Sequence, residues 1–162
     1  MKICAVICEY NPFHFGHAYL ISEMKKRGAV VAVMSGSFTQ RGEPAVISKY
    51  ERARAALLGG ADLVLELPFP YSSSCAERFA SAGTDIVSAL GCVDELCFGS
   101  EAGNIDSLRT AAERTASSAF VDAVKSCLSE GHGISYRSAV SEVYKKLYGA
   151  ELCGGSNDIL AI

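Results

Sequence analysis

Short apolar runs alternate with amphipathic stretches along about the first hundred residues, a pattern that predicts alternating strands and helices. Four apolar runs are expected to be strands: residues 2–8, 29–34, 62–67 and 94–98. The first two are apolar on both faces, which is typical of strands buried on both sides in a parallel sheet. Each run is bounded by a turn-forming residue such as Pro12, Pro68 or Gly99.

The segments between the strands have helical spacing of their apolar positions. The first helix is expected over about residues 17–26 and is expected to end at Gly28. Ser48 is placed to cap a second helix that stops at Gly59. A third helix is expected over residues 74–90. This order predicts parallel strands with right-handed crossovers, hence an α/β fold with a doubly wound, Rossmann-like sheet.

Beyond the fourth strand the pattern is helical only, over residues 105–148, with breaks near Ser117 and at 131–133. We therefore expect residues 1–103 to form a nucleotide-binding α/β domain and 104–162 to be a helical continuation of it. A helix start is expected around residues 156–158, and the chain stops about one turn later. The expectation is a C-terminally truncated chain.

Composition narrows the class of protein. The chain has 162 residues, 49% hydrophobic and 20% charged, which is typical of a globular domain. Its formal net charge is −3, whereas most nucleic-acid-binding domains carry a net positive charge. The seven cysteines are odd in number and form no Cys-x-x-Cys pair, which argues against a zinc site and for reduced thiols. Neither a secretory leader nor a membrane-spanning run is visible, so a cytoplasmic protein is expected.

The chemistry is predicted to lie where the first strand meets the first helix. Residues 8–17 read Cys-Glu-Tyr-Asn-Pro-Phe-His-Phe-Gly-His. Ligands of open α/β sheets bind at the carboxyl ends of the strands, and a helix start there offers N–H groups to a phosphate. His14 and His17 are candidate donors to the charge that develops on phosphate during attack on ATP, and Gly16 lets the backbone approach it. A metal site is the alternative, but no Glu follows as in His-Glu-x-x-His, so no metal ligands are predicted.

Charged residues elsewhere are weaker candidates. The loop and helix after the second strand carry Arg41, Lys49, Arg52 and Arg54, which could receive a phosphate or carboxylate. Arg41, on a loop beside a glycine, is the candidate substrate contact, whereas Arg54 is expected on a solvated helix face.

Three further positions have both a functional and a structural interpretation. Glu66, at the end of the third strand, either builds the pocket or pairs with a nearby arginine, and the second is favoured. Gly99 allows close approach of a nucleotide or simply ends its strand. His132, between two glycines, is expected in a surface loop.

Four blocks together resemble the bacterial tRNA(Met) cytidine acetate ligase family, which belongs to the nucleotidylyltransferase superfamily with the His-x-Gly-His signature. The blocks are Glu9-Tyr10-Asn11-Pro12-Phe13-His14-x-Gly16-His17, Met34-Ser35-Gly36-x-Phe38-x-Gln40-Arg41-Gly42-Glu43-Pro44-Ala45, Asp62-Leu63-Val64-x-Glu66-Leu67-Pro68 and Phe98-Gly99-Ser100-Glu101. The resemblance covers essentially the whole chain. It departs at Phe15, where Asn is common, and before Asn157, where a Pro-containing run is usual.

The resemblance implies an ATP-dependent ligase, with Mg²⁺ expected beside ATP. Such enzymes activate acetate as acetyladenylate and transfer acetyl to N4 of the wobble cytidine of elongator tRNA(Met). It also implies which residues bind ATP: Ile7, Cys8, Glu9, Tyr10, Asn11, Pro12, Phe13, His14, Phe15, Gly16, His17, Ala18, Tyr19, Leu20, Gly99 and Asn157. The family's Ser/Thr-Arg phosphate motif and C-terminal region lie beyond Ile162, so tRNA is expected to bind mainly outside this chain.

Two other functions stay open. One is a small-molecule adenylyl- or cytidylyltransferase of the same superfamily, and the other is an ATP-binding module without activity. The Gln-Arg-Gly-Glu-Pro block at residues 40–44 favours the tRNA-modifying ligase.

Overall fold

The computed structural model describes residues 1–130, 133–152, 155, 157–158 and 162. The chain forms two compact units, Met1–Phe98 and Gly99–Ile162, each with its own hydrophobic core. None of the helices in the described residues is long and apolar enough to cross a membrane.

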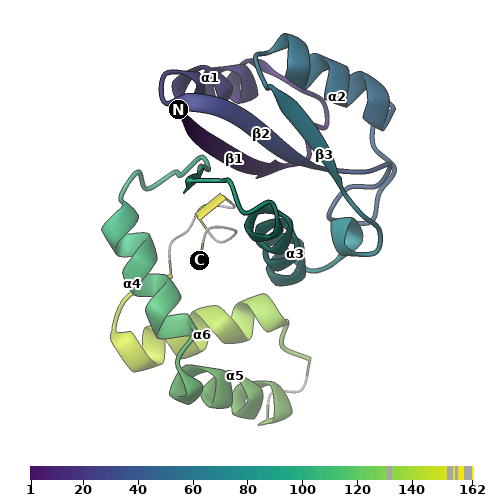
Figure 1. Ribbon diagram of the computed structural model, residues 1–162. Coiled ribbons are helices and arrows are strands. Elements are labelled where there is room, and N and C mark those ends of the chain that lie inside the picture. Colours follow the sequence, from purple (N-terminus) through teal and green to yellow (C-terminus); the bar gives the residue numbers. More distant parts are fainter. Residues whose placement is uncertain (131–132, 153–154, 156, 159–161) are drawn as a thin grey trace. The chain divides into compact units, whose positions relative to one another are not determined.

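The first unit is built on a four-stranded sheet in the order β3-β2-β1-β4 (Figure 1). Its strands are β1 (Lys2–Cys8), β2 (Gly28–Ser35), β3 (Leu63–Leu67) and β4 (Glu95–Leu96). Every pair is parallel, which confirms the predicted doubly wound α/β fold. The fourth strand is shorter than expected, since only Glu95 and Leu96 pair in register with β1.

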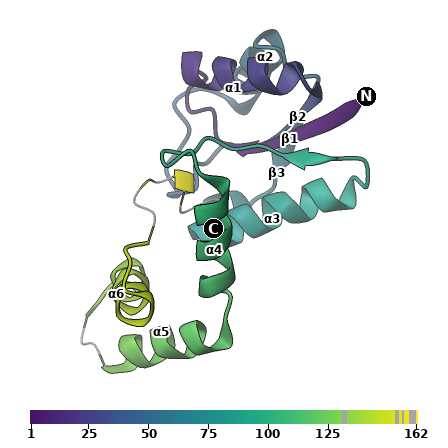
Figure 2. The same cartoon turned by 90° about the vertical axis from the view of Figure 1, so that its left-hand side faces the viewer.

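Helices cover both faces of this sheet (Figures 1 and 2). Helices α1 (Phe15–Lys25) and α2 (Lys49–Leu58) lie on one face, and α3 (Ala76–Ala89) lies on the other. The apolar residues of β1 and β2 contribute to the apolar clusters on both faces of the sheet, because alternate residues of a strand face opposite sides. On the α3 side, Gly83 lies against Ile7, and a Cβ there would stand 2.6 Å from the Ile7 side chain.

Two predicted boundaries are wrong for identifiable reasons. Helix α1 begins at Phe15 rather than near residue 17, because the His14 side chain caps it. Gly28 does not end the helix, which stops at Lys25; it opens β2 instead. Gly28 is paired with Lys2 across the sheet, and a Cβ on it would meet the Lys2 carbonyl oxygen at 1.9 Å. Glycine is therefore required there by strand packing.

The second unit is helical, as the sequence pattern predicts. It contains α4 (Ile105–Thr115), α5 (Ser118–Glu130) and α6 (Tyr136–Tyr148). Phe120, Val124, Ala139, Val143 and Tyr144 are among the buried residues of its core. The expected break at Ser117 separates α4 from α5. The predicted loop residue His132 lies outside the described residues.

Candidate active site

The turn between β1 and α1 has an unusual backbone. Tyr10 has φ 51°, in the left-handed region that a bulky residue rarely adopts. Its side chain is nevertheless 2% exposed, and its ring meets those of Phe13 and His17 edge-on at 5.1 and 4.8 Å between centroids. Conformations of this kind persist only where the surroundings hold them, and they concentrate at functional sites.

The two histidines cap the start of α1 reciprocally. The Gly16 N–H donates to Nδ1 of His14 at 3.1 Å, and the His14 N–H donates to Nδ1 of His17 at 3.3 Å. The two rings stack with centroids 3.6 Å apart. Because each Nδ1 accepts a hydrogen bond, the proton of each neutral imidazole resides on Nε2. The cap therefore leaves Nε2–H as the donor that each ring offers to a ligand.

The cap engages one backbone donor of the helix start. The N–H of Gly16 is not free for a ligand, because it donates to Nδ1 of His14. The need for glycine has a local reason too, since a Cβ on Gly16 would lie 3.0 Å from the His14 ring. The two imidazoles therefore accept hydrogen bonds from two of the N–H groups at this helix start, those of His14 and Gly16.

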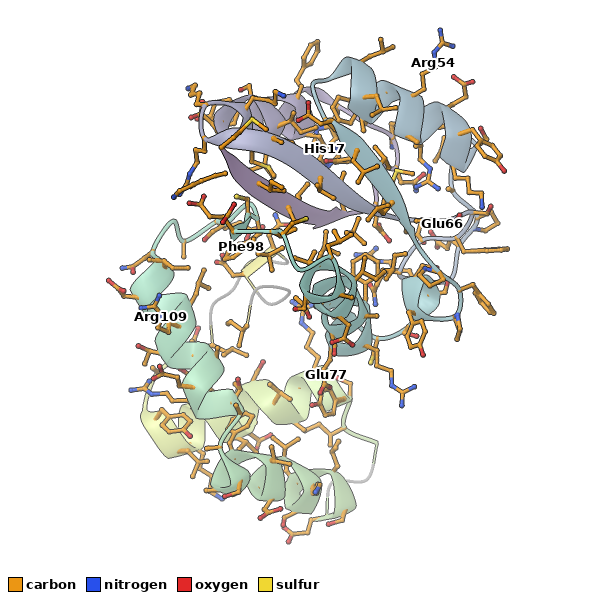
Figure 3. The ribbon with its side chains drawn as sticks, viewed as in Figure 1. His17, Arg54, Glu66, Glu77, Phe98 and Arg109 are labelled. Carbon is orange, nitrogen blue, oxygen red and sulfur yellow. The ribbon has the colours of Figure 1, made fainter. Side chains whose placement is uncertain are left out.

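The charge state of His17 suits a donor. Burial, and secondarily the neighbouring His14, lower the pKa of His17 to about 4. The ring is therefore neutral at physiological pH and keeps one Nε2–H. His17 lies on α1, above the sheet face that this helix covers (Figure 3).

The buried side chain of Arg52 holds the turn between β1 and α1 in place through hydrogen bonds. It is 0% exposed, and its guanidinium donates to the carbonyl oxygens of Glu9 (2.6 Å), Ile47 (3.3 Å) and Gly36. Burial lowers its pKa from the ordinary value. The sequence suggested Arg52 as one of several possible phosphate ligands, and that interpretation is wrong because the guanidinium is buried and bonded within the chain, to three carbonyl oxygens and to Ser35 Oγ. It instead joins the ends of β1 and β2 beside Tyr10.

Two residues of the predicted ATP stretch hold the loop after β2. The Glu9 carboxylate accepts from the Gln40 N–H, and Asn11 Oδ1 accepts from the Val46 N–H at 2.7 Å. Gln40 in turn donates through Nε2 to the Ser74 carbonyl oxygen at 2.6 Å. These contacts explain why the first two sequence blocks occur together: one positions the other.

The other basic residues of this segment differ in what they contact. Lys49 forms an ion pair with Glu66 at 2.7 Å, so the expected partner of Glu66 is a lysine rather than an arginine. Arg54 is exposed and lies 3.9 Å from Glu51, as expected for a solvated helix face. Arg41 is exposed and makes no hydrogen bond or ion pair with any residue that the structure describes. Its predicted contact with substrate stays a prediction.

The rest of the predicted ATP stretch differs in accessibility. Phe15 and Tyr19 are 93% and 68% exposed, whereas Ile7 and Leu20 pack against the cores. Burial raises the pKa of the Cys8 thiol to about 12, so this cysteine is no nucleophile at neutral pH. A covalent enzyme intermediate on Cys8 is therefore disfavoured.

The two other predicted ATP contacts, Gly99 and Asn157, belong to the second unit, and residues next to them are hydrogen-bonded to one another. Asp158 is 1% exposed and accepts from Ser100 Oγ at 2.6 Å and from two backbone N–H groups of residues 101–102. Asn157 Nδ2 donates to Glu101 at 2.9 Å. The loop that starts at Gly99 is thus bound to the segment of Asn157. Asp158 was missed from sequence because a lone Asp near a chain end has no pattern around it.

One further cluster contains potential metal ligands, away from the histidines. Ligand atoms of Cys4, Glu95 and Cys97 lie within 4.8 Å of one another. Glu95 is already paired with Lys2 at 2.6 Å and Arg27 at 2.7 Å. Burial raises the pKa of Cys97, which disfavours the thiolate that a metal needs.

A parallel α/β sheet with paired histidines at its first strand-to-helix turn is the arrangement that the His-x-Gly-His signature predicts for nucleotidyl transferases. The chain matches the family described as HIGH Nucleotidyl Transferase over residues 1–162, and it belongs to that family.

Particular relatives narrow the comparison. The chain is 42% identical to a tRNA(Met) cytidine acetate ligase of Geobacillus sp. (strain WCH70), over 94% of this chain and 38% of the relative. It is 44% identical to the protein of the same name from Acetivibrio thermocellus, over 100% of this chain and 41% of the relative. It also resembles the crystal structure of Thermotoga maritima TmcAL bound with alpha-thio ATP, with TM-score 0.85 and 36% identity over 99% of this chain and 42% of that chain. The chain therefore spans about two fifths of the length of these relatives.

Proposed function

We propose that this chain is the ATP-binding, acetate-activating part of a tRNA-modifying ligase. The observation that carries the proposal is the reciprocal histidine cap, which presents two Nε2–H donors at the carboxyl edge of a parallel sheet. The names of the relatives supply the substrates: they are tRNA(Met) cytidine acetate ligases, and a solved relative binds an ATP analogue. The same proposal places the protein in the cytoplasm.

The first proposed step is nucleotidyl transfer to acetate. A carboxylate oxygen of acetate attacks the α-phosphorus of ATP, the bond from that phosphorus to the β-phosphate oxygen breaks, and pyrophosphate leaves with the electron pair. Negative charge grows on the phosphate oxygens, and fixed donors stabilise it without a covalent intermediate. His14 and His17 are assigned this role. Mg²⁺ is expected to arrive on the ATP phosphates, since it is bound largely through substrate oxygens in such sites.

The second proposed step uses the mixed anhydride. The N4 nitrogen of a cytosine attacks the acetyl carbon, the bond from that carbon to the AMP oxygen breaks, AMP leaves with the electron pair, and the amine releases one proton to solvent. The acceptor is proposed to be the wobble cytidine of elongator tRNA(Met). Because the net charge of this chain is −3, most phosphate contacts with tRNA are assigned to regions outside it.

The nucleotide contacts follow from the same proposal. The ATP stretch from Ile7 to Leu20 contributes mainly its backbone and the two imidazoles. Gly99 is assigned a close contact with ATP, as the resemblance of the Phe98-Gly99-Ser100-Glu101 block to the family implies. Asn157 is assigned a further contact, and its bond to Glu101 holds it in place.

The test is pyrophosphate release by the full-length protein with ATP, Mg²⁺ and acetate. Acetate-dependent release, followed by N4-acetylcytidine in added tRNA, is the expected result. Release that needs a different acceptor and ignores acetate would instead identify a small-molecule nucleotidyl transferase. ATP binding without any release would identify a nucleotide-binding module, and either outcome contradicts the proposal.

A further inference from the structure

A pocket lies in the first unit, at the sheet edge where β2 and β3 end. Its volume is about 250 Å³, and it is lined by Gly36, Ser37, Phe38, Glu66, Phe69 and Ser72. Met34 of β2 is level with Cys8 of β1 on one side and with Glu66 of β3 on the other. At ~4.8 Å per strand spacing, Glu66 is therefore about 10 Å from the end of β1, on the same edge of the sheet.

The lining combines flat apolar surface with one carboxylate. Phe38 and Phe69 are 44% and 73% exposed although both are large aromatic residues. Glu66 is exposed and lies near the carboxyl end of β3 (Figure 3). Ser72 is 2% exposed, and its hydroxyl has no hydrogen bond to any residue in the described part of the chain. The pocket thus offers aromatic faces, a hydrogen-bond acceptor and an unpaired hydroxyl.

The Glu66 carboxylate is held in position. Lys49 Nζ contacts its two oxygens at 2.8 and 2.7 Å. Gly36 makes room for it, because a Cβ there would lie 2.4 Å from Glu66 Oε1. A carboxylate has about four acceptor positions, so the lysine leaves some available. These contacts fix the acceptor at the pocket wall without occupying it fully.

The lining selects among ligands. The free acceptor positions of Glu66 favour a ligand that donates a hydrogen bond, which neither a phosphate dianion nor an acetate does. Pockets for drug-sized ligands measure about 300–1,000 Å³, so the volume here suits a single flat ring rather than a whole nucleotide. Unstacked bases of single-stranded RNA bind on aromatic side chains and through hydrogen bonds at their edges. Glu accepts from the N4 amino group of cytosine, whereas uracil presents a carbonyl oxygen there.

We propose that this pocket receives the unstacked cytosine that is to be acetylated. Phe38 and Phe69 supply the surfaces for its faces, and Glu66 accepts a hydrogen bond from its exocyclic amino group. The inference rests on the proposed function, which it deepens by locating the acceptor base. Glu66 and Phe69 become residues that determine base specificity.

The test measures cytidine and uridine binding to the full-length protein, with the ATP site saturated by a nonhydrolysable ATP analogue. The wild type is expected to prefer cytidine. Phe69→Ala is expected to weaken cytidine binding about 5- to 140-fold, which corresponds to the ~1–3 kcal/mol of base stacking on an aromatic ring. Glu66→Gln is expected to remove most of the preference for cytidine over uridine, because an amide both donates and accepts. Leu58→Ala, an exposed apolar residue of α2 outside the pocket, and Glu51→Gln are the matched controls and are expected to bind as the wild type does.

Two results would overturn the inference: equal binding of cytidine and uridine by the wild type, or unchanged cytidine binding in Phe69→Ala. Acetate-dependent pyrophosphate release by the wild type, measured on the same preparation, tests the proposed function separately. Release with equal binding of the two nucleosides keeps the function and rejects the pocket. Cytidine preference that Phe69→Ala abolishes, without release, keeps the pocket and rejects the acetate chemistry.

Discussion

Arg52 gives the sharpest test of how the site is held together. Arg52→Met keeps most of the apolar stem but removes the hydrogen bonds to the carbonyl oxygens of Glu9, Gly36 and Ile47. A hydrogen bond to a charged group contributes about 1.5–3 kcal/mol, so three correspond to a gross loss of roughly 4.5–9 kcal/mol. The relieved desolvation of the guanidinium offsets part of this, and a net loss of about 3–5 kcal/mol in the free energy of unfolding is expected.

The assay is urea unfolding followed by far-ultraviolet circular dichroism, since the chain has no tryptophan. Arg54→Met is the matched control, because Arg54 lies on the same helix and reaches only the exposed Glu51 at 3.9 Å. Its loss is expected to stay within about 0.5 kcal/mol, as for most surface substitutions. If Arg52→Met also stays within that range, the guanidinium does not anchor the turn and the reasoning is refuted.

Three more predictions concern the histidine cap. His17→Asn, which retains an acceptor for the His14 N–H but removes Nε2–H, is expected to lower kcat of the full-length enzyme about 10²- to 10³-fold with little change in Tm; near-normal turnover would remove the assigned role. Gly16→Ala is expected to crowd the His14 ring, which a Cβ would approach to 3.0 Å, and to weaken affinity for a nonhydrolysable ATP analogue in calorimetric titration; unchanged affinity would show that the ring position is unimportant. In the nucleotide-free protein the His17 imidazole is expected to titrate by NMR with a pKa of about 4. Because the pKa of histidine in the unfolded chain is near 6.5, the free energy of unfolding should fall as pH drops from about 6.5 to 4. A measured pKa near 6.5 would contradict the buried, neutral ring.

The alternation of apolar runs and helical stretches was enough to predict that the strands are parallel, and the first two runs are apolar on both faces, as buried strands are. Boundaries depended on contacts that periodicity does not encode. Gly28 lies against the carbonyl oxygen of Lys2, which is far away in the sequence. Periodicity therefore did not show that Gly28 begins β2.

The functional residues divide in the same way. Residue types and spacing at His14 and His17 indicated a site at this turn, but not that the two rings accept hydrogen bonds from the N–H groups of Gly16 and His14. Arg52 was misread because sequence shows a cation without showing its burial. Glu66 was named from sequence as a possible pocket residue, but its neighbours Phe38 and Phe69 were not, because they come from separate segments and meet Glu66 only in the folded chain.

The central claim is that acetate is activated by nucleotidyl transfer at the histidine turn. The most direct measurement supplies the full-length protein with ATP, Mg²⁺, tRNA and acetate carrying a heavy oxygen isotope in its carboxylate, and weighs the nucleotide products by mass spectrometry. The account predicts AMP that carries one heavy oxygen, because the attacking carboxylate oxygen stays with AMP when the acetyl group leaves. Heavy oxygen in inorganic phosphate together with ADP would show attack at the γ-phosphate and would contradict it.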